Sequence, residues 1–366
     1  MEWKEQDMKN LHQTITIIKE VEKTHKNLGL PLIFAKMIDF SNLGLFLIAE
    51  RGKGKTAILE ALIGKPMQHR TILKVGAITF KGLKKIAYKL DRNTVTVINP
   101  DFSTLYSEYL REVAVNLFSQ LLYDHAISEM HTAQYDIEIE DCYISFLSGM
   151  QPQMYRTVST LPTFESMYKD RFIRFFMLYP LGTPKYQPEP PKIKAPIIFE
   201  AISFDAVRIE PKILKHKLYK KLVKLMGWHT SEGRAEDYVQ RLLKASAKIN
   251  NRLYVTESDL KLLDLYQPYL MMEKWISERL VGVAEPLQFN PHSYVIFFRV
   301  VERGEVKRSD LKKEFQVSYV TLHNNIKPLM AQRLIKGKFG TATYRVHPEW
   351  EKKYLKPIRE FHELLL

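Results

Sequence analysis

The sequence predicts an α/β protein with a parallel sheet, followed by a helical region and a small C-terminal α/β unit. Short apolar runs alternate with helical patterns over the first half of the 366-residue chain. This alternation is typical of a parallel sheet, because helical crossovers between its strands cover the sheet faces. Six prolines between residues 180 and 196 then indicate an extended connector. After it the pattern becomes helical to about residue 285, and a shorter mixed unit ends the chain.

Individual elements follow from the spacing of apolar residues. Residues 1–40 are expected to be helical, because Leu11, Ile15, Ile18 and Val21 recur three or four positions apart. Five apolar runs that are too short for helices are expected to form strands, and helical stretches are expected between them. These runs are 43–48, Thr71–Val75, Thr94–Ile98, Cys142–Leu147 and Phe172–Leu178.

Composition narrows the class of protein. Lys and Arg number 55 against 41 acids, a net charge of +14, which favours polyanionic partners such as nucleic acid; a solubility surface is the alternative. The single cysteine, Cys142, excludes an intrachain disulfide and a cysteine zinc cage. No apolar run is long enough to cross a membrane, and the first residues lack the apolar core of a signal peptide. A cytoplasmic location is therefore expected.

A phosphate-binding loop directly follows the first apolar run. The Walker A pattern is matched by Ala49-Glu50-Arg51-Gly52-Lys53-Gly54-Lys55-Thr56, except that Ala49 replaces the first glycine. Gly52 and Gly54 allow the backbone N–H groups to turn inward, and the following helix presents its positive end to an anion. Lys55 is expected to reach the β- and γ-phosphates, with the Thr56 hydroxyl on Mg²⁺. The motif predicts ATP and Mg²⁺ as cofactors.

The acidic site that such a loop needs is less complete. The strand Thr94–Ile98 ends in Asn99-Pro100-Asp101-Phe102-Ser103, which has one acid and not a pair. If Asp101 is the acid that holds Mg²⁺, Phe102 occupies the position of the catalytic acid. If Asp101 is instead the catalytic acid, Pro100 occupies the position of the metal-binding acid. Glu108 could compensate. Slow hydrolysis, or ATP binding alone, is the alternative to fast turnover.

Three further segments carry a family resemblance. Ser148-Gly149-Met150-Gln151-Pro152 resembles the sensor 1 segment of minichromosome maintenance (MCM) helicases within the AAA+ ATPases, with Gln151 in place of Asn. Lys169-Asp170-Arg171-Phe172 resembles their arginine-finger segment, and Arg174 is a second candidate for the finger. The resemblance implies that Gln151 positions the attacking water and that Arg171 stabilises transition-state charge at a neighbouring subunit.

The third segment is similar to the lid of that family. Its pattern has a sensor 2 arginine, a second arginine seven residues on, an Ala-x-Ala pair and Val-Thr-x-x-Asp. These correspond to Arg234, Arg241, Ala245, Ala247 and 255–259. Thr256 is expected to cap a new helix there. An ordinary amphipathic helical hairpin is the alternative explanation. The resemblance implies a catalytic role for Arg234.

Residues 291–350 have the pattern of a winged helix-turn-helix. A first helix is expected over Ser293–Glu302, a second capped by Ser309, a recognition helix over Tyr319–Gln332, and a two-stranded wing over 334–346. Val320, Leu322, Ile326 and Leu329 are expected to face inward. A protein-binding module is the alternative to DNA binding. Groups expected to reach bases or phosphates are Tyr319, Thr321, His323, Asn324, Lys327, Lys336, Lys338 and Arg345.

These expectations combine into a domain plan. It comprises a helical segment (1–40), an AAA+ core (41–196), a helical lid (197–287), a winged helix (288–350) and a C-terminal helix (351–366). The resemblance implies a ring-forming replicative DNA helicase or a helicase-like motor. It also implies a homo-oligomer, for which a hexamer is one candidate assembly. Duplex DNA would bind the winged helix and a single strand the ring pore. An ATP-switch initiator or loader, and an ATP-gated transcription or transposition regulator, are the alternatives.

Overall fold

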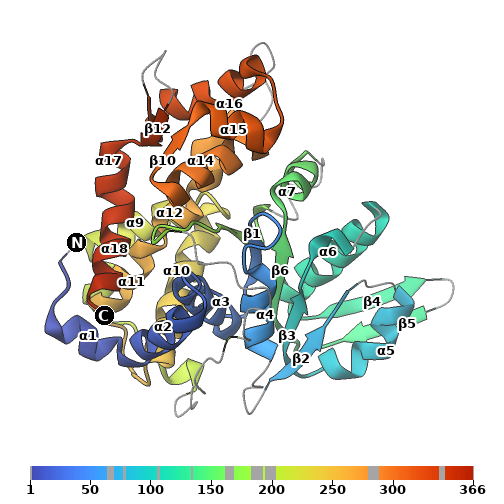
Figure 1. The fold of residues 1–366 in the computed structure, drawn as a ribbon. Helices are drawn as coiled ribbons and strands as arrows, with labels where there is room; N and C mark the ends of the chain where they lie inside the picture. The colour runs from blue at the N-terminus through green and yellow to red at the C-terminus, as the bar shows by residue number, and fades with distance from the viewer. Residues whose placement is uncertain are drawn as a thin grey trace.

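The structure is a computed structural model that describes most of the chain. The described residues are 2–63, 70–76, 80–104, 108–132, 135–160, 169–182, 193, 203–278, 288–337 and 343–365. Figure 1 shows the central sheet on the right and the N-terminal and middle helices on the left. Part of the C-terminal region lies above these helices, and the last helices of the chain run down the left side beside them.

The sheet has five parallel strands in the order β2-β3-β6-β1-β7. The five apolar runs predicted from the sequence form these five strands, and their bounds differ from the prediction by one to three residues. β1 has all five residues buried, as expected for a strand covered on both faces. The strands are β1 (Gly44–Ile48), β2 (Thr71–Lys74), β3 (Thr94–Asn99), β6 (Tyr143–Met150) and β7 (Phe172–Phe176).

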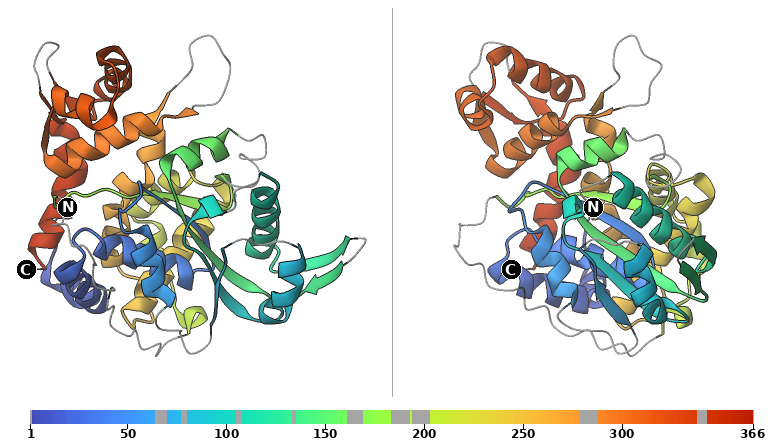
Figure 2. Two further views of the ribbon diagram at one scale, coloured as in Figure 1. Left: turned by 45° about the vertical axis from the view of Figure 1, so that its right-hand side comes forward. Right: turned by 90° about the vertical axis from the view of Figure 1, so that its right-hand side faces the viewer.

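Helices follow the strands, but one hairpin was not predicted. The core helices are α4 (Lys55–Ile63), α5 (Phe80–Leu90), α6 (Glu108–Tyr123) and α7 (Pro152–Ser159), with a 3₁₀ turn at Phe102–Thr104. The expectation of helix between the third and fourth strands is wrong over β4 (Ile127–Thr132) and β5 (Tyr135–Ile139), which pair antiparallel. Figure 2 shows this hairpin projecting from the sheet. Residues 135–140 alternate apolar and acidic side chains, a strand period that could have revealed it.

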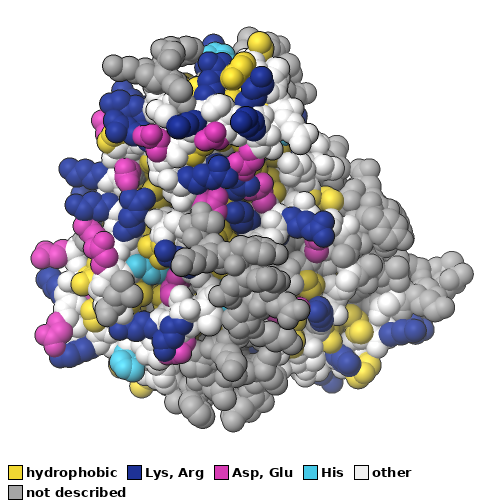
Figure 3. Space-filling view, in the orientation of Figure 1, with side chains coloured by type: hydrophobic (Ala, Val, Ile, Leu, Met, Phe, Trp, Pro, Cys, Tyr) yellow, Lys and Arg dark blue, Asp and Glu magenta, His cyan; other side chains and the backbone are white. Residues whose placement is uncertain are grey.

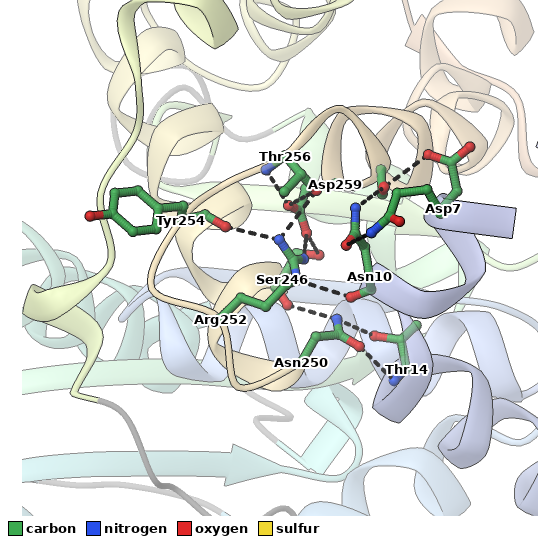
Figure 4. A network of polar contacts seen from close by, with 11 residues as sticks. Asp7, Asn10, Thr14, Ser246, Asn250, Arg252, Tyr254, Thr256 and Asp259 are labelled. Atoms are coloured by element: carbon green, nitrogen blue, oxygen red, sulfur yellow. Dashed lines mark hydrogen bonds and ion pairs between the residues drawn. The ribbon is translucent and has the colours of Figure 1, made fainter. Parts of the chain in front are cut away.

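The predicted N-terminal helical segment forms α1 (Glu5–Asn10), α2 (His12–Thr24) and α3 (Gly29–Phe40). α3 packs on the sheet and on α10, while α1 packs on α11. Figure 4 shows the polar contacts that join these helices to the middle of the chain. Thr14 and Asn250 exchange two hydrogen bonds, and Arg252 donates to the carbonyl of Asn10 at 2.9 Å. The N-terminal segment is thus packed against, and hydrogen-bonded to, the helical region in the middle of the chain.

The middle region is helical as expected up to residue 276. Its helices are α8 (Pro211–Leu214), α9 (Lys217–Met226), α10 (Glu232–Ile249), α11 (Glu257–Leu265), α12 (Gln267–Leu270) and α13 (Met272–Ile276). Thr256 caps α11 through a capping box with Asp259, as predicted. The expectation of helix to residue 285 is wrong at β8 (Ser277–Glu278), which pairs with β9 (Gln288–Phe289).

The C-terminal region is helical with a small antiparallel sheet, in the predicted order of elements. These are α14 (Pro291–Arg303), β10 (Glu305–Lys307), α15 (Arg308–Phe315), α16 (Tyr319–Ala331), β11 (Ile335–Lys336) and β12 (Thr343–Val346). Ser309 was expected to cap the second helix, which is wrong, because that helix begins at Arg308 after Lys307. The chain ends in α17 (Pro348–Trp350), a π-helical turn (Glu351–Leu355) and α18 (Lys356–Glu363).

Candidate functional site

The Walker A segment forms the loop between β1 and α4, at the carboxyl edge of the sheet. Gly52 and Gly54 have φ of +74° and +84°, a backbone conformation that favours glycine. A Cβ on Gly54 would also lie 2.6 Å from the Leu28 side chain. The two glycines therefore allow the tight turn, and the loop ends at the first turn of α4, where helix N–H groups favour an anion.

Lys55 folds back into this loop. Its ammonium group donates to the carbonyl oxygens of Ala49 and Glu50, each at 2.7 Å, and the residue is 8% exposed. Burial lowers the Lys55 pKa to about 8, and the charges of Asp101 and Glu50 oppose that shift. Thr56 is exposed beside it on the first turn of α4. A bound triphosphate would have to draw Lys55 away from these carbonyls.

The ends of β3 and β6 lie beside the loop. Asp101 follows β3 and accepts hydrogen bonds from the backbone N–H and hydroxyl of Ser103 at 3.0 and 2.7 Å. Phe102 is fully buried, with its ring 5.3 Å from that of Phe46, so this position supplies no polar group. Asn99, the last residue of β3, is buried and bonded to Ser148 at 2.8 Å. Asp101 is therefore the carboxylate that the segment 99–103 brings to the loop.

Gln151 also reaches this edge. It directly follows β6 and is the N-cap residue of α7. The carbonyl of the preceding residue, Met150, accepts a hydrogen bond from the backbone N–H of Ala49 at 3.1 Å. Gly149 is required here, since a Cβ would lie 2.5 Å from the Pro100 carbonyl oxygen. The structure thus brings together the loop 49–56, Asp101 and Gln151; the side chain of Glu108 lies outside the described part.

Arg171 and Arg234 lie at the opposite, amino edge of the sheet. Arg171 precedes β7, whose first residue pairs with Gly44 at the start of β1. The four residue steps from Gly44 to Ile48 at the other end of β1 span about 13 Å. The Walker A loop 49–56, called the P-loop below, begins directly after Ile48. Arg234 forms an ion pair with Asp170. The guanidinium groups of Arg171 and Arg234 lie over the Tyr123 ring, 5.4 and 4.1 Å from its centroid. The two arginines gather on one tyrosine, away from the P-loop of their own chain.

Arg174 is a structural residue, so its candidacy as an arginine finger is wrong. It is fully buried, and its Nε is 2.7 Å from a carboxylate oxygen of Glu273. Its terminal nitrogens donate to backbone carbonyls, among them that of Trp228 at 2.8 Å. A guanidinium held in this way joins β7 to the helical region and is not available to a neighbouring subunit.

Helix α14 packs against the P-loop, which the sequence did not indicate. Lys53 Nζ lies 2.8 Å from Glu302 Oε1, and Arg299 lies 2.8 Å from a carboxylate oxygen of Glu50. The Tyr294 hydroxyl contacts carbonyl oxygens at the end of β1 and directly after β7. The Glu302 side chain is 3% exposed. The C-terminal region is therefore joined to the loop by two ion pairs, and to the ends of the flanking strands by a buried hydroxyl.

The proposed recognition helix, α16, presents most of its predicted polar groups outward. Leu322, Ile326 and Leu329 are buried as predicted, but Val320 is 69% exposed. Val320 precedes Leu322 by two residues, about 200° around the helix, which points it away from the buried stripe. Lys338 lies outside the described residues, and His323 is half-buried. Tyr319, Thr321, Asn324, Lys327, Lys336 and Arg345 are exposed.

Basic side chains surround the start of α16. The Tyr319 ring has Lys312 Nζ 4.3 Å and the Arg308 guanidinium 4.7 Å from its centroid. On β11 and β12, Lys336 pairs with Arg345. Figure 3 shows Lys and Arg side chains over this upper part of the molecule, interspersed with acids. The surface is thus basic around an exposed helix end, without being uniformly positive.

Comparisons with known proteins identify no family for this chain. No family model matches the chain, and no curated protein matches it. Among solved structures, it is similar to a “putative ATPase” from Cytophaga hutchinsonii ATCC 33406, with 13% identity and a TM-score of 0.39. The match covers 73% of this chain and 88% of that one. A likeness this distant carries no conclusion about activity. Within the described residues, no helix has the length and apolar character needed to cross a membrane.

Proposed function

We propose that this chain is a P-loop ATPase of the AAA+ type that acts on DNA. The observation that carries the proposal is the Walker A loop at the end of β1, at the same edge of the sheet as Asp101 and Gln151. β6 pairs with β1 and precedes Gln151, and β3 pairs with β6 and precedes Asp101. Ligands bind at the carboxyl ends of parallel strands, and the loop adds a helix N-terminus and an amine. ATP phosphates would occupy the loop, with Mg²⁺ held by Thr56 and Asp101.

The test of nucleotide binding is Lys55→Ala. Calorimetry should detect ATP binding to the wild-type chain, and the variant should lose it because the loop loses its buried amine. Lys84→Ala, on α5, is the matched control and should bind as the wild type does. Equal affinity of the Lys55 variant and the wild type would overturn the assignment of this loop.

The motor role is the first candidate function at this site. A helicase or similar ring motor would hydrolyse ATP with Asp101 and Gln151, while Arg171 and Arg234 act on the nucleotide of a neighbouring subunit. Both arginines lie at the amino edge of the sheet, away from the P-loop of their own chain. This position favours action on the nucleotide of a neighbouring subunit rather than on their own. Asp101→Asn should stop turnover while binding persists.

An ATP-switch initiator or loader is the second candidate, favoured by the single carboxylate and the buried Phe102. A wild-type ATPase rate no higher than that of Asp101→Asn, together with ATP-dependent assembly on DNA, would favour the switch. Strand displacement driven by ATP would favour the motor. One purified sample serves both assays.

The winged-helix role rests on the exposed polar groups of α16 and the basic residues around Tyr319. Lys327→Ala in the full-length chain should weaken binding to all duplex sequences and reduce the salt slope by about one. Asn324→Ala should reduce the difference in binding free energy between preferred and other duplex sequences by about 1–3 kcal/mol. If neither variant changes duplex affinity, the helix is not a DNA reader and docking to a protein becomes the better explanation.

A further inference from the structure

A polar cleft lies between α10 and the amino edge of the sheet, at the edge opposite the Walker A loop. It has a volume of about 790 Å³, within the range of small-ligand pockets. The sheet contributes Asn42, Thr94 and Tyr143, which stand just before β1 or at the first positions of β3 and β6. α10 contributes Arg241 and Lys244 from the facing side.

Positive charge exceeds negative charge along this cleft. Four of its described lining residues are cations, namely Arg70, Arg241, Lys244 and Lys248, against the two carboxylates of Asp205 and Asp237. Asp237 is paired with Arg241 at 2.8 Å. The excess of cations around a concave surface favours an anionic ligand.

One of these cations, Arg70, is largely buried and held by several partners. Arg70 donates to Asn42 Oδ1 at 2.8 Å and to Thr96 Oγ1 at 3.1 Å. It also lies 3.5 Å from the buried carboxylate of Asp39, which accepts from the hydroxyls of Thr96 and Ser145. The Arg70 side chain is 9% exposed. A guanidinium fixed by this many partners is oriented before any ligand arrives, which lowers the entropic cost of binding.

Aromatic rings lie among the cations. The residue Tyr143 is 44% exposed, and its ring centroid lies 4.6 Å from that of His125. Lys244 Nζ is 5.9 Å from the Phe204 ring centroid. Exposed aromatic faces beside basic groups are the combination that holds a nucleic-acid base and its phosphate, by stacking and by charge.

We infer that this cleft binds a nucleotide unit, a phosphate attached to an aromatic base, at a site separate from the P-loop. The phosphate contacts Arg241, Lys244 and Arg70, and the base stacks on Tyr143. The unit comes from a free nucleotide or from a single-stranded nucleic acid. The inference does not depend on ATP binding at the P-loop, because the two sites lie at opposite edges of the sheet.

The experiment uses the full chain carrying Lys55→Ala, so that the P-loop does not contribute. Two probes are titrated: ADP by calorimetry, and a fluorescein-labelled twelve-residue oligothymidylate by anisotropy. The test variant adds Arg241→Ala and Lys244→Ala. The control adds Lys217→Ala and Lys220→Ala on α9, an equal loss of charge on an exposed face.

The test variant should lose about tenfold or more in affinity for at least one probe, while the control variant keeps it. Loss for ADP identifies a free-nucleotide site, and loss for the oligonucleotide alone identifies a strand site. For the strand, the salt slope should fall by about 0.7 per phosphate contact removed. Tyr143→Ala should weaken the same probe about tenfold with an unchanged salt slope. No difference between test and control variants for either probe overturns the inference.

Discussion

Replacing Asp259 with asparagine should lower the free energy of unfolding by about 3 kcal/mol, at the lower end of the range for breaking a buried ion pair. Asp259 is fully buried and accepts from Arg252 Nη2 and Ser246 Oγ at 2.6 Å each, and from the Thr256 N–H at 2.8 Å (Figure 4). The amide keeps one acceptor oxygen but leaves Arg252 without a counter-ion. Arg252 is 17% exposed, so water relieves part of that cost.

Urea unfolding measures this loss as a shift in midpoint at constant slope. Glu257→Gln is the matched control, because Glu257 is exposed on the first turn of the same helix and its charge contributes at most about 1 kcal/mol there. The double variant Arg252→Met, Asp259→Leu should regain part of the stability, since no buried charge is left unpaired. Equal losses for Asp259→Asn and Glu257→Gln would refute the reasoning.

Three further predictions concern the loop and the C-terminal helix. Gly149→Ala should destabilise the chain by about 1–3 kcal/mol in urea, whereas Gly233→Ala, whose Cβ meets nothing within 4 Å, should not. Glu302→Gln should speed hydrogen exchange of the P-loop by freeing Lys53, and unchanged exchange would argue against that contact. Burial lowers the pKa of His362 to about 4, so its stabilising contribution is present above pH 6.5 and lost as pH falls toward 4. Between pH 7 and 4.5 the wild type should lose about 2–3 kcal/mol more of its free energy of unfolding than His362→Gln, as measured by urea unfolding.

Local features of the sequence predicted the sheet and its loop. Each strand is a short apolar run, and the loop needs two glycines with positive φ next to a lysine, so neighbouring residues suffice to reveal both. The cap at Thr256 was found for the same reason, since a capping box spans four residues. The hairpin β4–β5 carried a readable alternation that the expectation of helix overlooked.

Contacts between distant segments were decided by the tertiary structure. The Lys53–Glu302 pair joins positions 249 residues apart, and no spacing along the chain encodes it. The same holds for Arg171 and Arg234, which share the Tyr123 ring only because the helical region packs at the amino edge of the sheet. Arg174 was a plausible finger by motif, yet its strand position buries it against Glu273. Periodicity reports which face of an element is apolar, whereas the partner of that face depends on how the whole chain packs.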